Sequence, residues 1–218
     1  MKSNSPSGEK TSEFSSFHRG IPNPNILLMY LEEKQHNAIT KLNPLIKDLI
    51  KNIKNKKLLD IGCGIGSVLC QGLIYYGLNP KNLYSLDQDP KNFENDEYSR
   101  ENKVVCKAEN LPFESNFFDV VHSNELTLDN PDLDYLKVLK EICRVLKPNG
   151  FYIANEHFDQ VEEMKKINEN IKNNFKEIIK NKNLASIGFK PLIRAKYLDS
   201  PKIGKYQFIF YLFQKKSS

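Results

Sequence analysis

The sequence lacks the features that mark metal-binding, disulfide-bonded, secreted and membrane-spanning proteins. Its four cysteines form no C-x-x-C pair and no cluster of histidines accompanies them, so we expect no disulfide and no metal site. No apolar run approaches the roughly 18 residues that a membrane-spanning helix needs. The first residues show no apolar core of the kind that secretory signals carry. These absences predict a cytoplasmic protein without a membrane span.

The chain also has no long block of like charges. Its net charge of +5 arises from 32 basic and 27 acidic residues, and this mild excess permits nucleic-acid binding without indicating it. We therefore expect no nucleic-acid partner. The composition, with 39% hydrophobic and 27% charged residues, is ordinary for a globular chain. It gives no indication of an oligomeric state.

The N-terminal part divides into a tail and a helical region. Residues 1–16 are polar and rich in serine, and they lack the apolar surface that would offset the entropy of ordering them, so we expect a mobile tail. Residues 17–218 are enough for a single domain with a substantial core. A helical pattern over 25–53 is interrupted by Pro44, which predicts two helices. We expect 17–54 to supply a lid and packing helices.

The most informative stretch is 57–67, which reads KLLDIGCGIGS. Its apolar residues have the pattern of a strand buried on both faces of a parallel sheet. Gly62, Gly64 and Gly66 then allow a sharp turn and a close approach of a ligand to the backbone. A helical pattern follows from Ser67. A strand, a glycine loop and a helix in this order hold nucleotide-type ligands at a helix start; the alternative is a turn without a ligand.

Short apolar runs alternate with helical patterns along the rest of the chain. They predict strands at 83–87, 104–106, 118–123 and 151–154, and then a hairpin of two β-rich runs at 192–197 and 206–213. Apolar residues at every third position from Leu133 to Val145 predict a helix that begins at Pro131, with Asn130 as its cap. The run KPNG at 147–150 ends that helix, and its Asn149 tolerates a left-handed turn.

Three motifs resemble those of one family. The glycine spacing D-x-G-x-G-x-G at 60–66 differs from the dinucleotide pattern G-x-G-x-x-G and resembles motif I of the class I S-adenosylmethionine-dependent methyltransferases. The runs at 107–121 and 141–150 also look like this family, in particular its broad type 11 group. The resemblance implies a Rossmann-like α/β fold with helices on both faces. Its seven-stranded sheet would be mostly parallel, with an antiparallel last strand.

The resemblance also implies S-adenosyl-L-methionine as the cofactor. Asp87, at the end of the second predicted strand, would bind the ribose diol, while Asp89 before Pro90 suits a helix cap. The family often has an aspartate where this chain has Lys107, so we expect the backbone at Ala108 and Glu109 to hold the adenine. The full set of expected cofactor-binding residues is Asp60, Gly62, Cys63, Gly64, Gly66, Asp87, Gln88, Ala108, Glu109, Ser123 and Asn124.

Candidate bases lie at the predicted strand ends, and they are His157, His122 and Glu125. A histidine near its reference pKa suits proton removal at neutral pH, although His122 equally suits packing within the sheet. No Asn-Pro-Pro-Tyr run follows the fourth strand and no Pro-Cys nucleophile is present, so we expect a small-molecule methyl acceptor. The alternatives are a protein or RNA methyltransferase, or a binding protein that has kept the fold and lost catalysis.

Overall fold

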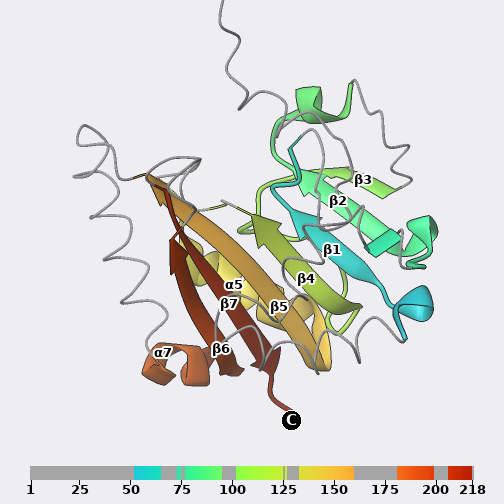
Figure 1. Cartoon of the computed structure of the whole chain (residues 1–218). Coiled ribbons are helices and arrows are strands. Elements are labelled where there is room, and N and C mark those ends of the chain that lie inside the picture. The colour runs from blue at the N-terminus through green and yellow to red at the C-terminus, as the bar shows by residue number, and fades with distance from the viewer. Residues whose placement is uncertain are drawn as a thin grey trace, which may run out of the picture.

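The computed structural model describes residues 52–64, 73–74, 77–94, 102–124, 126, 133–159, 181–198 and 206–217. Its strands form one seven-stranded sheet in the order β3-β2-β1-β4-β5-β7-β6 (Figure 1). They are β1 (Leu58–Ile61), β2 (Leu83–Asp87), β3 (Asn102–Val105), β4 (Phe118–Asn124), β5 (Leu146–Asp159), β6 (Phe189–Leu198) and β7 (Tyr206–Lys215). The first five pair in parallel, and β7 is antiparallel to both of its neighbours. The predicted mostly parallel sheet with an antiparallel last strand is therefore confirmed.

Strand β1 lies at the point where the strand order reverses. All four of its residues are buried, and Leu58 pairs with Leu83 of β2 on one side and with Val120 of β4 on the other. Such a continuous buried run is what a strand covered on both faces requires. Because all three strands run in the same direction, their carboxyl ends meet at one edge of the sheet, where open α/β sheets bind ligands.

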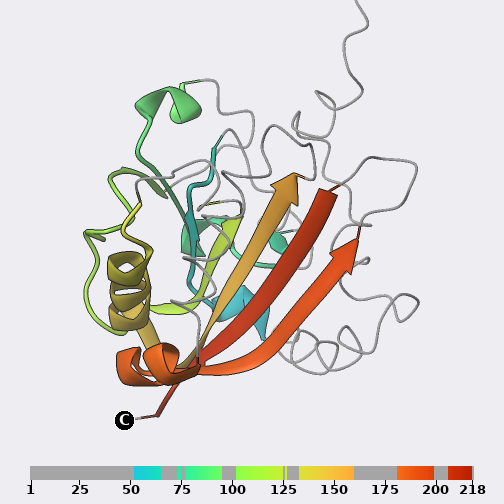
Figure 2. The same ribbon diagram turned by 90° about the vertical axis from the view of Figure 1, so that its left-hand side faces the viewer.

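The helices that the structure describes cover one face of the sheet (Figure 2). They are α5 (Tyr135–Val145) and α7 (Asn181–Ile187), with short 3-10 helices η1 (Ile53–Asn55), η2 (Pro80–Asn82) and η3 (Pro90–Phe93) at the edges. The expected tail, lid and N-terminal helices up to residue 51 lie outside the described residues, as does most of the helix expected from Ser67. None of the described helices is long and apolar enough to cross a membrane.

Helix α5 begins later than its apolar pattern predicts. The Asp134 side chain accepts a hydrogen bond from the Lys137 amide at 3.0 Å and so caps the helix at Tyr135, whereas Asn130 lies outside the described residues. Leu136 is 38% exposed, because a spacing of three residues drifts away from a helix face that repeats every 3.6 residues. The side chains that α5 does bury are Tyr135, Val138, Leu139, Ile142, Cys143 and Val145.

Strand β5 is longer than the predicted 151–154. It continues to Asp159 because its antiparallel neighbour β7 continues beside it, with Glu156 opposite Ile209 and His157 opposite Phe208. The parallel neighbour of β5, strand β4, is not paired with it that far: their last paired residues are Asn124 and Asn155. The expectation that His157 emerges just after the fifth strand is therefore wrong: its backbone is part of β5.

Asn149, near the start of β5, adopts the left-handed conformation that was expected for it. Its φ of 63° is left-handed, a conformation that asparagine tolerates better than most residues. The following Gly150 is tightly enclosed, since a Cβ there would lie 2.9 Å from the Lys147 carbonyl oxygen and 3.0 Å from that of Asp119. The close packing at this turn therefore depends on Gly150.

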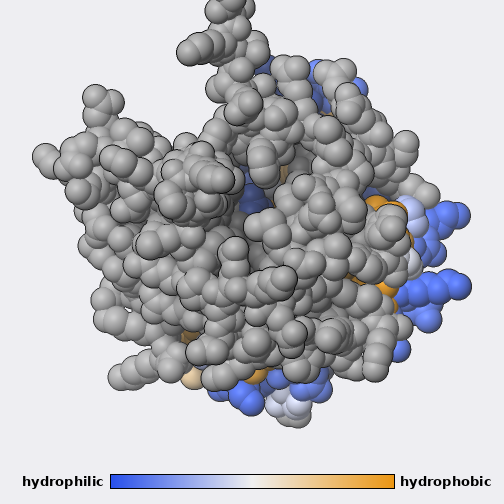
Figure 3. All heavy atoms as spheres, in the orientation of Figure 1, coloured by the Kyte–Doolittle hydropathy of each residue, from blue (hydrophilic) through white to orange (hydrophobic). Residues whose placement is uncertain are grey.

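The surface drawn in Figure 3 is mixed in character. Where described residues reach this face they are mainly hydrophilic along its lower and right-hand edges, with a few hydrophobic residues between them. Such a distribution is normal for a chain with this composition.

Replacing Gly150 with alanine is expected to lower the free energy of unfolding by about 1–3 kcal/mol, because the new methyl group overlaps two backbone carbonyls that cannot move independently. Asn149→Gly is the matched control at the preceding position: it should change stability by no more than about 0.5 kcal/mol, since glycine adopts the same φ. Urea unfolding measures both. An unchanged midpoint for Gly150→Ala would contradict the packing described here.

Candidate functional site

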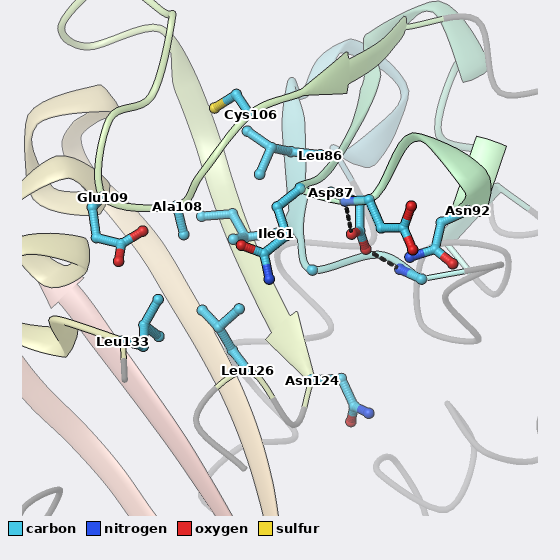
Figure 4. Close-up of a pocket in the computed structure, with 14 residues that line it drawn as sticks. Ile61, Leu86, Asp87, Asn92, Cys106, Ala108, Glu109, Asn124, Leu126 and Leu133 are labelled. Carbon is cyan, nitrogen blue, oxygen red and sulfur yellow. Dashed lines mark hydrogen bonds between the residues drawn. The ribbon is translucent and has the colours of Figure 1, made fainter. Parts of the chain in front are cut away.

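A pocket of about 250 Å³ lies at the carboxyl ends of β1, β2 and β4. Figure 4 shows Asp87 and Asn92 at one side of it, Glu109 and Leu133 at the other, and Leu126 between them. The described residues that line it are Ile61, Gly62, Gly64, Leu86, Asp87, Gln88, Asp89, Asn92, Cys106, Ala108, Glu109, Asn124, Leu126 and Leu133. Its floor is thus apolar, and its rim carries three carboxylates and several amides.

The Asp87 carboxylate joins the glycine loop to the end of β2. Its Oδ2 accepts a hydrogen bond from the Gly64 amide at 2.9 Å, and its Oδ1 accepts one from the Asp89 amide at 2.9 Å (Figure 4). The amides of Gly62 and Cys63 donate to the Leu86 carbonyl at 2.8 and 3.0 Å. The loop backbone is therefore held against the pocket at a carboxylate that is only 8% exposed.

The glycines of the loop are required for its backbone conformation. Gly62 and Gly64 have φ values of 67° and 52°, in the left-handed region that side chains with a Cβ rarely adopt. A Cβ at Gly62 would lie 3.0 Å from Leu126 Cδ1, whereas a Cβ at Gly64 would meet nothing within 4 Å among the described residues. Gly64 lines the pocket, so a side chain at this position would meet none of the described residues before it reached a bound ligand.

The turn that follows β3 forms another wall of the pocket. The Cys106 amide donates to the Asp87 carbonyl at 3.0 Å, and the Asn110 amide closes the turn on the Lys107 carbonyl at 3.1 Å. Burial, and then the negative charges of Glu109 and Glu141, raise the pKa of the Cys106 thiol. Cys106 is therefore protonated at neutral pH.

Helix α5 holds the continuation of this turn through an ion pair. Arg144 donates to the Leu111 carbonyl at 2.8 Å and to the Phe113 carbonyl at 2.6 Å, while Glu141 accepts from the Leu111 amide at 2.9 Å. The hydrogen bond from Arg144 is the main cause that lowers the pKa of the Glu141 carboxyl, although burial opposes it; the same bond raises the pKa of Arg144. Both groups are therefore ionised at neutral pH.

His122 and Asp60 form a buried pair just below the pocket. The Nδ1 of His122 lies 2.7 Å from Oδ1 of Asp60, and the two side chains are 5% and 3% exposed. They stand opposite each other in the register of β1 and β4, so both point to the same face of the sheet. This contact fits the His122 tautomer that has its hydrogen on Nδ1 and donates it to the Asp60 oxygen. His122 is thereby held by a partner in the core, and it does not line the pocket.

A second buried polar group lies on the opposite face of the sheet, beneath α5. The Ser123 hydroxyl is 2.8 Å from that of Tyr152, which is 2.9 Å from that of Tyr135. All three residues are buried. Ser123 therefore links strand β4 through Tyr152 of β5 to Tyr135 of α5, and it is not among the residues that line the pocket.

The structure brings most of the expected cofactor-binding residues together around the pocket. Those that line it are Gly62, Gly64, Asp87, Gln88, Ala108, Glu109 and Asn124. Asp60, Cys63 and Ser123 do not, because each is buried beneath it with its side chain bonded to a core partner or to the loop backbone. Gly66 and Glu125 lie outside the described residues, and the side chain of His157 is likewise not described.

Several residues that line the pocket were not expected from the sequence. Ile61 and Leu86 belong to the ends of predicted strands, so their position next to a strand-end site could have been inferred. Asp89 was expected as a helix cap, and its side chain does accept a hydrogen bond from the Lys91 amide at 3.0 Å. Because η3 starts there, Asn92 comes to the pocket as well. Cys106, Leu126 and Leu133 carried no sequence signal for this position.

Comparison with known proteins defines first the class of the fold. The structure resembles that of an S-adenosylmethionine-dependent methyltransferase from Methanosarcina mazei, with a TM-score of 0.60 and 17% identity over 80% of this chain and 98% of that one. It also resembles geranyl diphosphate C-methyltransferase from Streptomyces coelicolor A3(2), with a TM-score of 0.54 and 14% identity over 86% of this chain and 84% of that one. The fold is that of the class I methyltransferases.

The sequence comparisons point to the same class of protein. Residues 59–154 match the family model described as a methyltransferase domain. Over 111 residues it is 32% identical to sterol 24-C-methyltransferase of Pneumocystis carinii, a match that covers 47% of this chain and 28% of that enzyme. The chain thus matches less than a third of the length of this curated relative.

Replacing His122 with phenylalanine is expected to lower the free energy of unfolding by about 3 kcal/mol or more, because it leaves the Asp60 carboxylate buried without its partner. Asp60→Asn keeps an oxygen that can accept from His122, so its loss should be much smaller. Denaturant unfolding of the two variants measures this difference. Equal stability losses would contradict the pairing.

Proposed function

We propose that this chain is an S-adenosylmethionine-dependent methyltransferase that acts on a small-molecule acceptor. The observation that carries the proposal is the position of Asp87, a nearly buried carboxylate at the end of β2 that borders the pocket and holds the glycine loop. Each of its oxygens accepts one backbone hydrogen bond and has a further lone pair for a ribose hydroxyl.

The remaining lining suits the other parts of this cofactor. The side chains of Ile61, Leu86 and Leu126 offer an apolar surface of the kind that a purine ring packs on. The turn at Ala108 and Glu109 supplies backbone groups at the same wall, as the sequence suggested for the adenine. This chain has Lys107 where the family often has an aspartate. Because Lys107 does not line the pocket, the lysine does not block an adenine at this wall.

The charge of the pocket favours a cationic ligand over a dinucleotide. Asp87, Asp89 and Glu109 line it, and no basic residue is among the described residues that do so. A sulfonium and an ammonium group are attracted by these carboxylates, whereas the pyrophosphate of a nicotinamide cofactor would be repelled by them. This supports the assignment that the glycine spacing suggested.

S-adenosylmethionine, when bound, supplies an electrophilic methyl group for a one-step displacement. The residues of this chain then have to hold the nucleoside, align the acceptor and exclude water, and alignment alone can lower such a barrier by several kcal/mol. His157, Glu125 and His122 stay predictions as bases. For His122, its pairing with Asp60 favours a structural role instead.

A small and largely apolar acceptor is supported by two comparisons. The sequence relative is named as a sterol methyltransferase and one structural relative as a geranyl diphosphate methyltransferase, and both names specify apolar carbon skeletons. The apolar residues Leu126 and Leu133 line the pocket on either side of the segment 127–132. Protein or RNA methylation and a non-catalytic binding role remain the competing proposals.

Titration calorimetry with S-adenosylhomocysteine, followed by methyl-transfer assays with sterol and isoprenoid acceptors, tests the proposal. Binding at micromolar ligand with transfer to a small molecule supports it. Binding without transfer to any acceptor favours a non-catalytic binding protein. Transfer to protein or RNA favours a protein or RNA methyltransferase. No binding at millimolar ligand would exclude the methyltransferase reading altogether.

Asp87→Ala is expected to weaken S-adenosylhomocysteine binding by about 1.5–3 kcal/mol, because it removes hydrogen bonds to a charged group. Asp134→Ala is the matched control: it removes a helix cap at a cost of about 1 kcal/mol in stability but does not line the pocket, so binding should be unchanged. Calorimetry gives both dissociation constants. An Asp87→Ala variant with wild-type affinity would show that this carboxylate does not hold the ribose.

Gly64→Val is expected to abolish cofactor binding while the protein still unfolds cooperatively. The branched side chain is strained at a φ of 52°, and it stands at a position that lines the pocket. Gly77→Val is the control, since Gly77 also has a positive φ of 104° and a Cβ there likewise meets none of the described residues within 4 Å, but it does not line the pocket. Both variants should lose stability, and only Gly64→Val should lose binding. Retained affinity in Gly64→Val would place the cofactor elsewhere.

A further inference from the structure

The pocket wall that contains Ala108 and Glu109 is fixed at its far end by helix α5. Leu111 is held at both of its backbone groups, since its amide donates to Glu141 at 2.9 Å and its carbonyl accepts from Arg144 at 2.8 Å. Only Asn110 separates Leu111 from Glu109 in the chain. Glu141 and Arg144 of α5 therefore set the position of Leu111, two residues after Glu109, which lines the pocket.

The geometry of the ion pair makes it a rigid anchor. Glu141 receives two parallel hydrogen bonds from Arg144, from Nε at 2.8 Å and from Nη2 at 2.7 Å. This bidentate arrangement fixes the plane of the guanidinium group. The remaining donors then point at two carbonyls, those of Leu111 and Phe113. A lysine carries a single charged centre and could not hold both carbonyls and the carboxylate in this way.

The near end of the same wall is fixed by the sheet. The Cys106 amide donates to the carbonyl of Asp87 at 3.0 Å, the residue whose carboxylate borders the pocket. The segment from Cys106 to Leu111 is therefore held by β2 at one end and by α5 at the other. Between these anchors, the turn closed by the Asn110 amide presents Ala108 and Glu109 to the pocket.

We infer that Glu141 and Arg144 are positioning residues that set the nucleoside-binding wall of this pocket. They do not line it, and they act by fixing the backbone of Leu111 and Phe113. The inference rests on the proposed binding of S-adenosylmethionine at this site. It predicts that removing the anchor loosens one wall and impairs recognition of the base, without changing the glycine loop or Asp87.

Asp119 provides a matched control for loss of a partly buried ion pair. It accepts hydrogen bonds from Lys147 Nζ at 2.8 Å and from the Lys57 amide at 3.0 Å, at the opposite end of β4 from the pocket. Burial raises the pKa of this carboxyl, but these hydrogen bonds and the charges of Lys147 and Lys56 outweigh burial and lower it. Asp119→Asn therefore disturbs a comparable network that has no contact with the wall.

Hydrogen exchange of the ligand-free protein tests the anchor directly. In Arg144→Met, the Leu111 amide should exchange at least about tenfold faster than in the wild type, because the carboxylate that accepts from it has lost the group that orients it. In Asp119→Asn the rate at Leu111 should be unchanged. Arg144→Lys keeps the charge without the fork and should give an intermediate rate. A Leu111 rate in Arg144→Met that equals that of the wild type would overturn the inference, whatever the ligand is.

Binding specificity separates positioning from a general loss of stability. We expect the wild type to prefer S-adenosylhomocysteine over S-inosylhomocysteine, in which an oxygen replaces the adenine amino group, and Arg144→Met to lose most of this preference through a roughly tenfold weaker binding of the adenine form. Asp119→Asn should keep the preference. If neither compound binds the wild type, the proposed function fails. If both bind and Arg144→Met keeps the wild-type ratio, only the positioning role fails.

Discussion

The arrangement of the pocket depends on one topological constraint, the position of β1 between two parallel neighbours. Because β2 and β4 run in the same direction as β1 on either side of it, three strand ends and the loops that follow them meet at one edge of the sheet. The burial of β1 makes this position costly to change, since Leu58, Leu59 and Ile61 would each lose about 1.5–3 kcal/mol of hydrophobic stabilisation on exposure. The site is therefore built at the end of a fully buried strand.

Three charged groups then convert that edge into a defined pocket. Asp87 holds the glycine loop through the Gly64 amide, and the pair of Glu141 and Arg144 holds the opposite wall through Leu111. Hydrogen bonds to charged groups contribute about 1.5–3 kcal/mol each, which is enough to select one conformation of a short loop. Because the walls are ordered before a ligand arrives, the entropic cost of binding is reduced.

The sequence predicted those parts of the structure whose signal is local. The strands β1, β2 and β4 were found because each contains a short run rich in apolar residues, and the left-handed turn at Asn149 follows from the properties of a single residue. The extension of β5 to Asp159 could not be found in this way, because it depends on pairing with β7 some fifty residues further along the chain.

The same limit applies to the pairing of Asp60 with His122. Asp60 was assigned to the cofactor as part of the glycine motif, and His122 was a candidate base at a strand end. Their hydrogen bond depends on the register between β1 and β4, which no motif encodes. Glu141 and Arg144 stand out in the sequence as part of a family-like run, but their partners are Leu111 and Phe113, about thirty residues away.

The positions of Asp87, Glu141 and Arg144 in the fold also suggest how proteins with this fold can differ in the methyl acceptor that they bind. Asp87 and the pair of Glu141 and Arg144 are attached to β2 and α5, whereas Leu126 and Leu133, which flank the segment 127–132, line the pocket without belonging to a strand or helix. Substitutions of Leu126 and Leu133 can change what the pocket accepts and leave both anchors in place. Selection for a new acceptor would then act on these two positions while the cofactor side stays fixed, which is how one fold comes to support many reactions.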